Sequence, residues 1–188
     1  ADGPMNEGDA HANALGNHLG LWEFVYEKKL QSNTIKIYHQ HLFEDTSGLR
    51  FHNRYDGLWG LMINGKNNTY LLEYLETTNQ NIDPPYVDDA YYNHWLYGYG
   101  WSYKGLTIGN PHINPFEVDP LNVVHFASSL NYNNKSLIIR LSKKTNIKSQ
   151  INTMISFEYG ENDTFSVSLY NQKNKFGISL GYEAILKN

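Results

Sequence analysis

The stretch FSVSLYNQKNKFGISLGYEA (165–184) carries the clearest signal for the fold. In its first half, Phe165, Val167 and Leu169 alternate with two serines and Tyr170. In its second half, large apolar residues at the even positions alternate with glycine, serine and glutamate. Because successive side chains of a strand point to opposite faces, this period of two predicts two β-strands, each with one apolar face.

The same period recurs along the chain, beginning after a Gly/Asn-rich lead-in (1–20). Four further stretches alternate clearly: LWEFVYEKK (21–29), VVHFASSLNY (123–132), LIIRLSK (137–143) and TMISFEY (153–159). Three others are less regular: TIKIYHQHLF (34–43), LWGLMIN (58–64) and YLLEYLE (70–76). These patterns predict an all-β protein, an antiparallel up-and-down meander of about nine strands without a convincing helix.

The connections between these strands alternate between short and long. The short ones are LQSN (30–33), GKNN (65–68) and NN (133–134), and the long ones are 44–57, 79–121 and KKTNIKSQ (143–150). In a meander this alternation places every long loop at one end of the strands, as in outer-membrane barrels. We therefore expect residues 1–188 to form one β-barrel segment with extracellular loops at 44–57 and 79–121, and a loop of that length is uncommon unless it is functional.

The two faces of the strands favour a membrane barrel over a soluble β-sandwich. In a sandwich the apolar faces point inward, whereas in a membrane barrel they point toward lipid. The polar face of the last two strands is built from small residues, mainly glycine and serine, rather than from the charged residues of a solvated face. Aromatic residues also lie near strand ends, where interfacial girdles occur: Tyr132, Tyr159, Phe165, Phe176 and Tyr182.

Composition excludes several classes of protein and site. A net charge of −4 and a pI near 6.0 leave no basic surface for nucleic acid. The absence of cysteine excludes disulfides, thiol nucleophiles and Cys-based metal sites. No apolar run approaches the roughly 20 residues of a membrane helix. Residues 1–17 show no secretion signal, so we expect the chain to be processed or cut from something longer.

Four segments resemble, in order, the C-terminal half of Wzi-type capsule-assembly proteins in their Bacteroidota-like version. They are GNHLGLWEF (16–24), YHQHLFEDTSGLRFHNRYDGLWG (38–60), YLLEYLETTNQ (70–80) and YNHWLYGYGWSYKGLTIGNP (92–111). The resemblance implies an outer-membrane barrel of about eighteen strands that holds capsular polysaccharide as a lectin, of which nine strands are half. Beyond residue 111 it rests on the strand pattern alone, and the end YEAILKN lacks the terminal aromatic residue usual in such barrels.

The aromatic-rich part of the long loop is the main candidate site. Sugars have apolar CH faces and a rim of hydroxyls, so aromatic platforms beside hydrogen-bonding side chains suit them. We expect the following residues to bind polysaccharide: Tyr91, Tyr92, Asn93, Trp95, Tyr97, Tyr99, Trp101, Tyr103, Lys104, Arg50, Arg54 and Asp56. The alternative is that the rings plug the barrel or pack the loop on itself, and that the arginines and Asp56 pair at a loop base.

Metal binding and catalysis have weaker signals. His39 and His41 share a strand face close to Glu44 and Asp45, but hydrogen-bonded histidines in the barrel lumen are the ordinary explanation for them. Calcium at the acids Asp83, Asp88 and Asp89 lacks the spacing of an EF-hand loop. A glycosidase pair at Glu73 and Glu76 has no defined separation, and no catalytic motif is present. We therefore expect no metal, no cofactor and no catalysis.

Together these observations predict a non-catalytic protein of the Gram-negative outer membrane that binds or anchors capsular or surface polysaccharide. Its expected partners are that polysaccharide, outer-membrane lipid and other envelope proteins, with no nucleic acid. Two alternatives remain. One is a passive channel or structural barrel component of a larger envelope complex, with the aromatic loop as a plug, and the other is a soluble β-sandwich carbohydrate-binding module.

Overall fold

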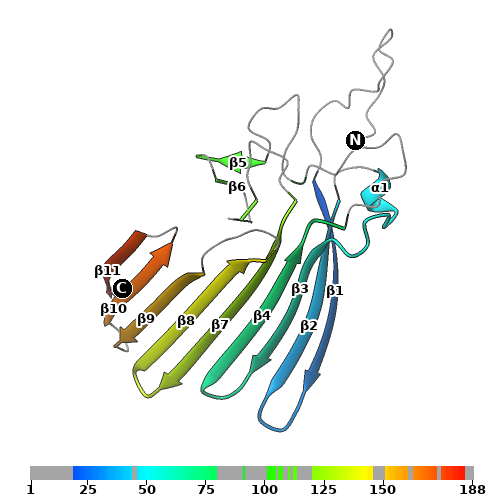
Figure 1. Ribbon diagram of the computed structural model, residues 1–188. Coiled ribbons are helices and arrows are strands. Elements are labelled where there is room, and N and C mark those ends of the chain that lie inside the picture. Colours follow the sequence, from blue (N-terminus) through cyan, green and yellow to red (C-terminus); the bar gives the residue numbers. More distant parts are fainter. Residues whose placement is uncertain are drawn as a thin grey trace. The chain divides into compact units, whose positions relative to one another are not determined.

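A computed structural model describes residues 19–43, 46–79, 91, 101–104, 106–107, 110, 112–113, 120–145, 151–160, 163–172 and 175–184. Nine strands form one sheet in the order β1-β2-β3-β4-β7-β8-β9-β10-β11, with successive strands as neighbours (Figure 1). Their bounds are β1 Gly20–Lys29, β2 Thr34–Phe43, β3 Gly57–Asn64, β4 Asn68–Glu76, β7 Asn122–Tyr132, β8 Lys135–Lys144, β9 Asn152–Tyr159, β10 Asp163–Gln172 and β11 Lys175–Ala184.

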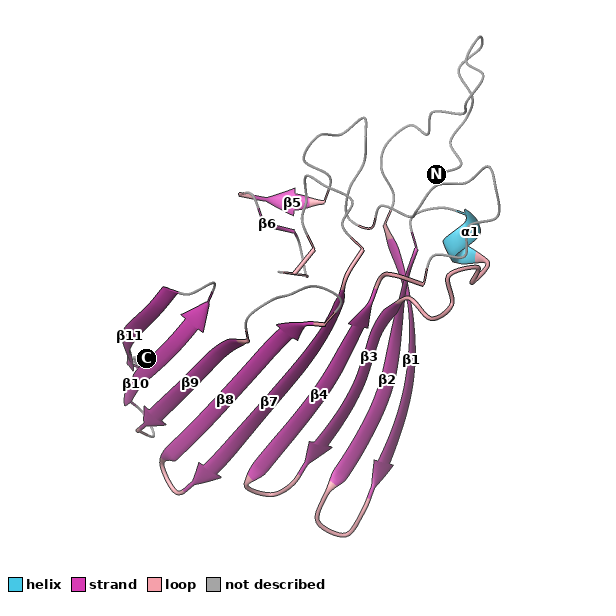
Figure 2. Cartoon of the chain, in the orientation of Figure 1, coloured by secondary structure: helices cyan, strands magenta, loops and turns pink. Residues whose placement is uncertain are grey.

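The predicted all-β meander is confirmed. The sheet is not closed, because β1 and β11 each have one neighbour, and this arrangement is consistent with half of a barrel. The structure adds three short elements that the periodicity does not predict: α1 (Thr46–Leu49) and a separate two-stranded sheet of β5 (Ser102–Tyr103) and β6 (Leu106–Thr107) (Figure 2). The described residues include no helix that is both long and apolar enough to cross a membrane.

The chain divides into two compact units. The first contains residues 1–24, 39–58 and 75–122, and therefore both long connections with α1, β5 and β6. The second contains residues 25–38, 59–74 and 123–188, and therefore nearly all of β7 to β11. Strands β1 to β4 contribute residues to both units.

In the second unit the strand register gathers the apolar residues of β7 to β11 on one face. The rows that run across this face show it directly. One row joins Tyr132, Lys135, Tyr159, Phe165 and Tyr182, and the next joins Leu130, Leu137, Phe157, Val167 and Leu180. The third joins Ser128, Ile139, Ile155, Leu169 and Ile178. The predicted separation of these strands into an apolar and a polar face is therefore confirmed.

The apolar face of β7 to β11 is open over most of its area. Leu180 is 77 % exposed and Ile178 62 % exposed, and no described residue forms a second layer over them. The apolar side chains that are buried lie elsewhere, almost all in the first unit: Leu42, Leu75, Tyr91, Ile113, Leu121 and Val123. Within the described residues, this face of the sheet has no second sheet packed on it.

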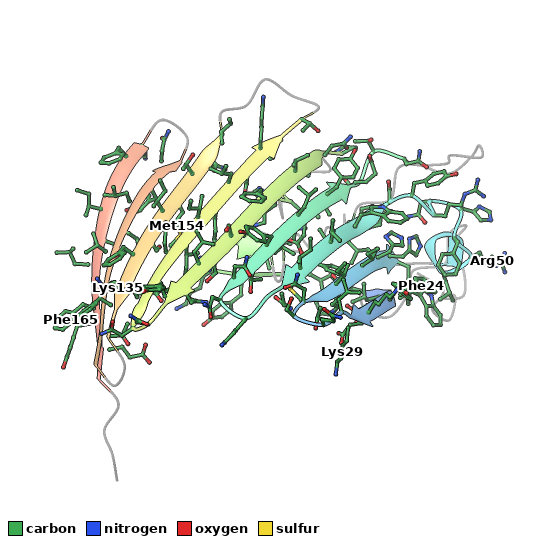
Figure 3. The ribbon with its side chains drawn as sticks, turned by 90° about the horizontal axis from the view of Figure 1, so that it is seen from below. Phe24, Lys29, Arg50, Lys135, Met154 and Phe165 are labelled. Carbon is green, nitrogen blue, oxygen red and sulfur yellow. The ribbon has the colours of Figure 1, made fainter. Side chains whose placement is uncertain are left out.

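The opposite face of the same strands is packed from small and polar side chains. Ser156 and Ser168, which are cross-strand partners, have their hydroxyl oxygens 2.8 Å apart. The Tyr170 ring lies over Gly177, where an added Cβ would come within 2.2 Å of the ring. Figure 3 labels Met154, another residue of this face. Small residues here leave room for rings to lie flat along the sheet.

Candidate functional site

In the first unit, Asp56 lies where the end of the first long loop meets residues of the second, a region that we call the loop base. Its side chain is fully buried, and its carboxylate accepts hydrogen bonds from the Tyr91 hydroxyl (2.9 Å) and the Asn79 backbone N–H (2.8 Å). The Tyr91 hydroxyl in turn accepts a hydrogen bond from the Asn53 amide. Hydrogen bonds to a charged acceptor are stronger than neutral ones, and a buried carboxylate requires them. Asp56 therefore joins the end of the first long loop to the second.

His41 holds the first long loop from the strand side. Its fully buried ring places Nε2 2.9 Å from the Gly48 carbonyl oxygen and Nδ1 3.1 Å from that of Asp56. The ring of Phe51 lies against it, with centroids 4.8 Å apart, and Phe51 adopts the left-handed backbone conformation (φ 60°) that is rare outside glycine. One side chain of β2 thus contacts both ends of the segment from Gly48 to Asp56 and can donate to one of its two carbonyl oxygens.

His39 and His41 lie on the face of β2 that adjoins the aromatic residues of β1. The Phe24 ring stacks on His39 with centroids 6.5 Å apart, so both histidines belong to the face that carries the aromatic residues of β1. The polar face of these two strands is marked instead by Gln40, which donates to Glu23 at 2.8 Å. β2 carries large residues on both faces, so the expectation that these histidines line a barrel lumen stays a prediction. No three His, Asp or Glu residues gather at one point in the described part of the chain.

The long connection between β4 and β7 is closed at its base. The Thr77 backbone N–H and hydroxyl both donate to the Leu121 carbonyl, at 3.1 and 3.0 Å, and Leu121 N–H donates back to the Thr77 hydroxyl at 2.8 Å. Farther out, the buried Thr107 hydroxyl donates to the Ile113 carbonyl at 2.7 Å. These bonds join the two ends of the connection and link Thr107 to Ile113 within it.

The β5–β6 hairpin presents an aromatic ring and a cation. Its register pairs Tyr103 with Leu106, and Lys104 follows in the left-handed conformation (φ 51°) that such tight hairpins use. Tyr103 is 68 % exposed, and the Lys104 ammonium lies 5.3 Å from its ring centroid. Trp101, just before β5, is half-buried, and its indole N–H is buried without a hydrogen-bond partner. This hairpin offers stacking area and a donor to a ligand.

The predicted site residues therefore fall into three groups. Tyr91 and Asp56 are buried at the loop base, where they support the loops, so their direct contact with a saccharide stays a prediction. Trp101, Tyr103 and Lys104 form the hairpin group. Arg50 and Arg54 are exposed on the first loop, where the Arg54 guanidinium lies 5.0 Å from the Tyr55 ring centroid. The remaining residues lie outside the described part of the chain: Tyr92, Asn93, Trp95, Tyr97 and Tyr99.

Sequence reasoning missed several supports of the loop base. Asn53, Thr77, Asn79 and Leu121 carry no motif, and their partners lie 23 to 44 residues away in the chain. A short-range pattern cannot reveal such pairs. One local feature points to these supports. The polar residues Asp56 and Thr77 directly adjoin β3 and β4, where backbone groups without a ladder partner need hydrogen bonds.

The similarity of this chain to a known family extends along nearly its whole length. A family model described as "Capsule assembly protein Wzi" matches residues 4–180, well beyond the segments whose resemblance is visible by eye. No curated protein and no solved structure matches the chain. Since the family model covers nearly the whole length, the chain belongs to the Wzi capsule-assembly family.

Proposed function

We propose that this chain forms part of the wall of an outer-membrane barrel, and that its long loops bind capsular or surface polysaccharide without catalysis. Membership of a capsule-assembly family supports the process. The observation that carries the proposal is the open apolar face of β7 to β11, because such a face is stable only against a non-aqueous surrounding. The open nine-stranded meander supports it as the partial wall of a barrel.

The aromatic row at the short-turn edge of this face supports the membrane placement. It consists of Tyr132, Tyr159, Phe165 and Tyr182 with Lys135, and Figure 3 labels Phe165 and Lys135. The rings contact one another across strands: the Phe165 and Tyr182 centroids are 4.8 Å apart, and the Lys135 ammonium is 6.0 Å from the Tyr159 centroid. Aromatic rings and lysine are favoured where hydrocarbon meets headgroups. This row fits an interfacial girdle.

Polysaccharide contact is best supported at the β5–β6 hairpin. The exposed Tyr103 ring is a platform for the CH face of a sugar, and Lys104 beside it can donate to hydroxyl or carboxylate oxygens. The loop that carries them is tied down by the Thr77–Leu121 bonds and by Tyr91 on Asp56. A site held in place before binding loses less entropy on binding. The aromatic residues from Tyr92 to Tyr99 lie outside the described residues, and their contact with polysaccharide stays a prediction.

The test combines Trp101→Ala with Tyr103→Ala. We expect capsule retention by cells to fall, and the affinity of the purified protein for capsular polysaccharide to drop about tenfold, as loss of about 1.4 kcal/mol of stacking predicts. Tyr132→Ala is the matched control, since this tyrosine is 73 % exposed but lies at a short turn. Unchanged binding in the double variant at normal protein levels would leave the loop as a plug rather than a binding surface.

A further inference from the structure

The segment from Gly48 to Asp56 lies over the apolar face of β1 and β2. The ring of His41, which belongs to that face, lies between the carbonyl oxygens of Gly48 and Asp56 at its two ends. The Phe51 ring lies 6.2 Å from the Phe24 ring and 6.4 Å from that of Trp22, measured between centroids. The polar face of the same strands, with Glu23 and Gln40, is on the other side. The segment therefore covers the apolar face of β1 and β2, the kind of strand face that a membrane barrel turns toward lipid.

The segment approaches this face as closely as its backbone allows. A Cβ added to Gly48 would lie 2.9 Å from the Phe43 Cβ, so a larger residue would push the segment off the strand. Phe51 accepts a left-handed backbone, and its N–H donates to the Gly48 carbonyl at 3.0 Å. A strained backbone that turns an aromatic ring onto the wall indicates that this position of the segment is specified.

Apolar side chains of the segment nevertheless remain exposed. Leu49 is 44 % exposed, Phe51 37 % and Tyr55 51 %, next to Phe24 at 52 %. Although the segment lies over part of the apolar face of β1, its own apolar side chains add to the apolar surface that stays exposed. An exposed apolar surface at the edge where strands meet their long loops suits the zone where acyl chains meet headgroups.

The exposed charges of this segment are cationic. They are those of Arg50 and Arg54, whose side chains are both exposed. Within residues 46–56 the single acid is Asp56, whose buried carboxylate accepts hydrogen bonds from Tyr91 and Asn79. Glu44 and Asp45, which precede the segment, lie outside the described residues. The described surface therefore combines apolar area with two guanidinium groups, which bind phosphate through paired N–H donors.

We propose that this outer patch, formed by Phe24, Leu49, Arg50, Phe51, Arg54 and Tyr55, binds a phosphorylated glycolipid of the outer leaflet. The acyl chains lie on Phe24, Leu49 and Phe51, and the headgroup phosphate is held by Arg50 and Arg54 (Figure 3 labels Phe24 and Arg50). The inference rests on the membrane placement in the proposed function. It assigns the two arginines to lipid rather than to polysaccharide, because aliphatic Leu49 offers no flat ring to a sugar, whereas acyl chains bury aliphatic and aromatic surface alike.

The test uses the full chain reconstituted in lipid nanodiscs that contain either diphosphorylated lipid A or the same glycolipid after enzymatic removal of its phosphates. Native mass spectrometry counts the retained glycolipid, and hydrogen exchange reports protection of residues 49–55. We expect the wild type to retain the phosphorylated form at least about tenfold better, and Arg50→Gln/Arg54→Gln to lose this preference. Lys28→Gln/Lys29→Gln, which removes two exposed charges from the other end of β1, should keep it.

The outcomes separate this inference from the proposed function. Equal retention of both glycolipids by a protein that inserts normally would overturn the lipid site and leave the membrane placement intact. Normal lipid preference but lost polysaccharide binding in the arginine variant would also overturn it, in favour of polysaccharide. Failure of the wild type to insert would sink the proposed function and the lipid site together.

Discussion

The apolar face of β7 to β11 and that of β1 and β2 next to the first long loop both consist of alternate strand residues. They differ in whether other residues of the chain cover them. On β11, Ile178 and Leu180 are more exposed than buried. On β2, His41 is completely buried because the segment from Gly48 to Asp56 folds over it. The alternation of apolar residues therefore reports a face, but it does not report whether protein or another medium covers that face.

The difference also concerns where polar groups can be buried. The open face of β7 to β11 carries no described side chain like Asp56, a carboxylate withdrawn from solvent and satisfied by hydrogen bonds. At the loop base such a group is tolerated because two segments distant in sequence bring donors to it. The stability of the open face therefore depends on what surrounds it. The stability of the loop base depends on hydrogen bonds within the chain.

The comparison breaks if the open face does not contact hydrocarbon. Ile178 and Ser179 are adjacent, exposed residues of β11 on opposite faces. Ile178→Arg should lower the free energy of unfolding in lipid vesicles by about 2–4 kcal/mol, because a charge on the lipid side of a barrel strand is poorly solvated. Guanidinium titration of the reconstituted protein measures it.

Ser179→Arg is the matched control and should change the free energy of unfolding by less than about 1 kcal/mol, because the opposite face is polar. Two equal and small effects would mean that both faces meet water, and the membrane placement would be wrong.

At the loop base the expected loss comes from protein contacts alone. Asp56→Ala removes a buried acceptor and leaves the Tyr91 hydroxyl and Asn79 N–H without their carboxylate, which should cost about 2–3 kcal/mol. The loss should appear as faster protease cleavage between residues 77 and 121, with the strands intact by circular dichroism. Tyr91→Phe, which removes one of these bonds, should cost about 1 kcal/mol.

Glu23→Ala serves as its control, since Glu23 is exposed and its hydrogen bond to Gln40 lies on the strand surface. We expect less than about 0.5 kcal/mol for it. If Asp56→Ala left cleavage unchanged, the buried carboxylate would not be what ties the two loops together.

The local sequence pattern was sufficient to predict the strands and insufficient to predict the contacts of the loops. The stretch predicted at 34–43 coincides with β2, and the faces of β7 to β11 follow from alternation, because strand geometry repeats every two residues. The side of the sheet for His41 was not predictable in this way, since β2 sets Ile35 and Ile37 against Lys36 and Tyr38. Neither the alternation nor the size of these residues marks one side as polar.

The contacts of the loop base could not be predicted from the sequence for a different reason. Tyr91 begins an aromatic run, and this run predicts contact with a ligand. The Tyr91 hydroxyl donates a hydrogen bond to Asp56, which lies 35 residues earlier in the chain. Such a contact depends on how two loops fold back, which no short window of sequence contains. The hairpin β5–β6 is likewise too short for a period to appear.

The polar face of β10 and β11 sharpens the comparison with the smallest expected effect. Gly177→Ala would bring a Cβ within 2.2 Å of the Tyr170 ring, so the ring must leave the sheet, which should cost about 1 kcal/mol. Gly181→Ala meets the Ser166 hydroxyl, which can rotate, and should be near neutral. Vesicle unfolding in the background of Tyr170→Ala completes a double-mutant cycle. There Gly177→Ala should cost nothing; an undiminished cost would show that Gly177 is required for its backbone and not for the ring above it.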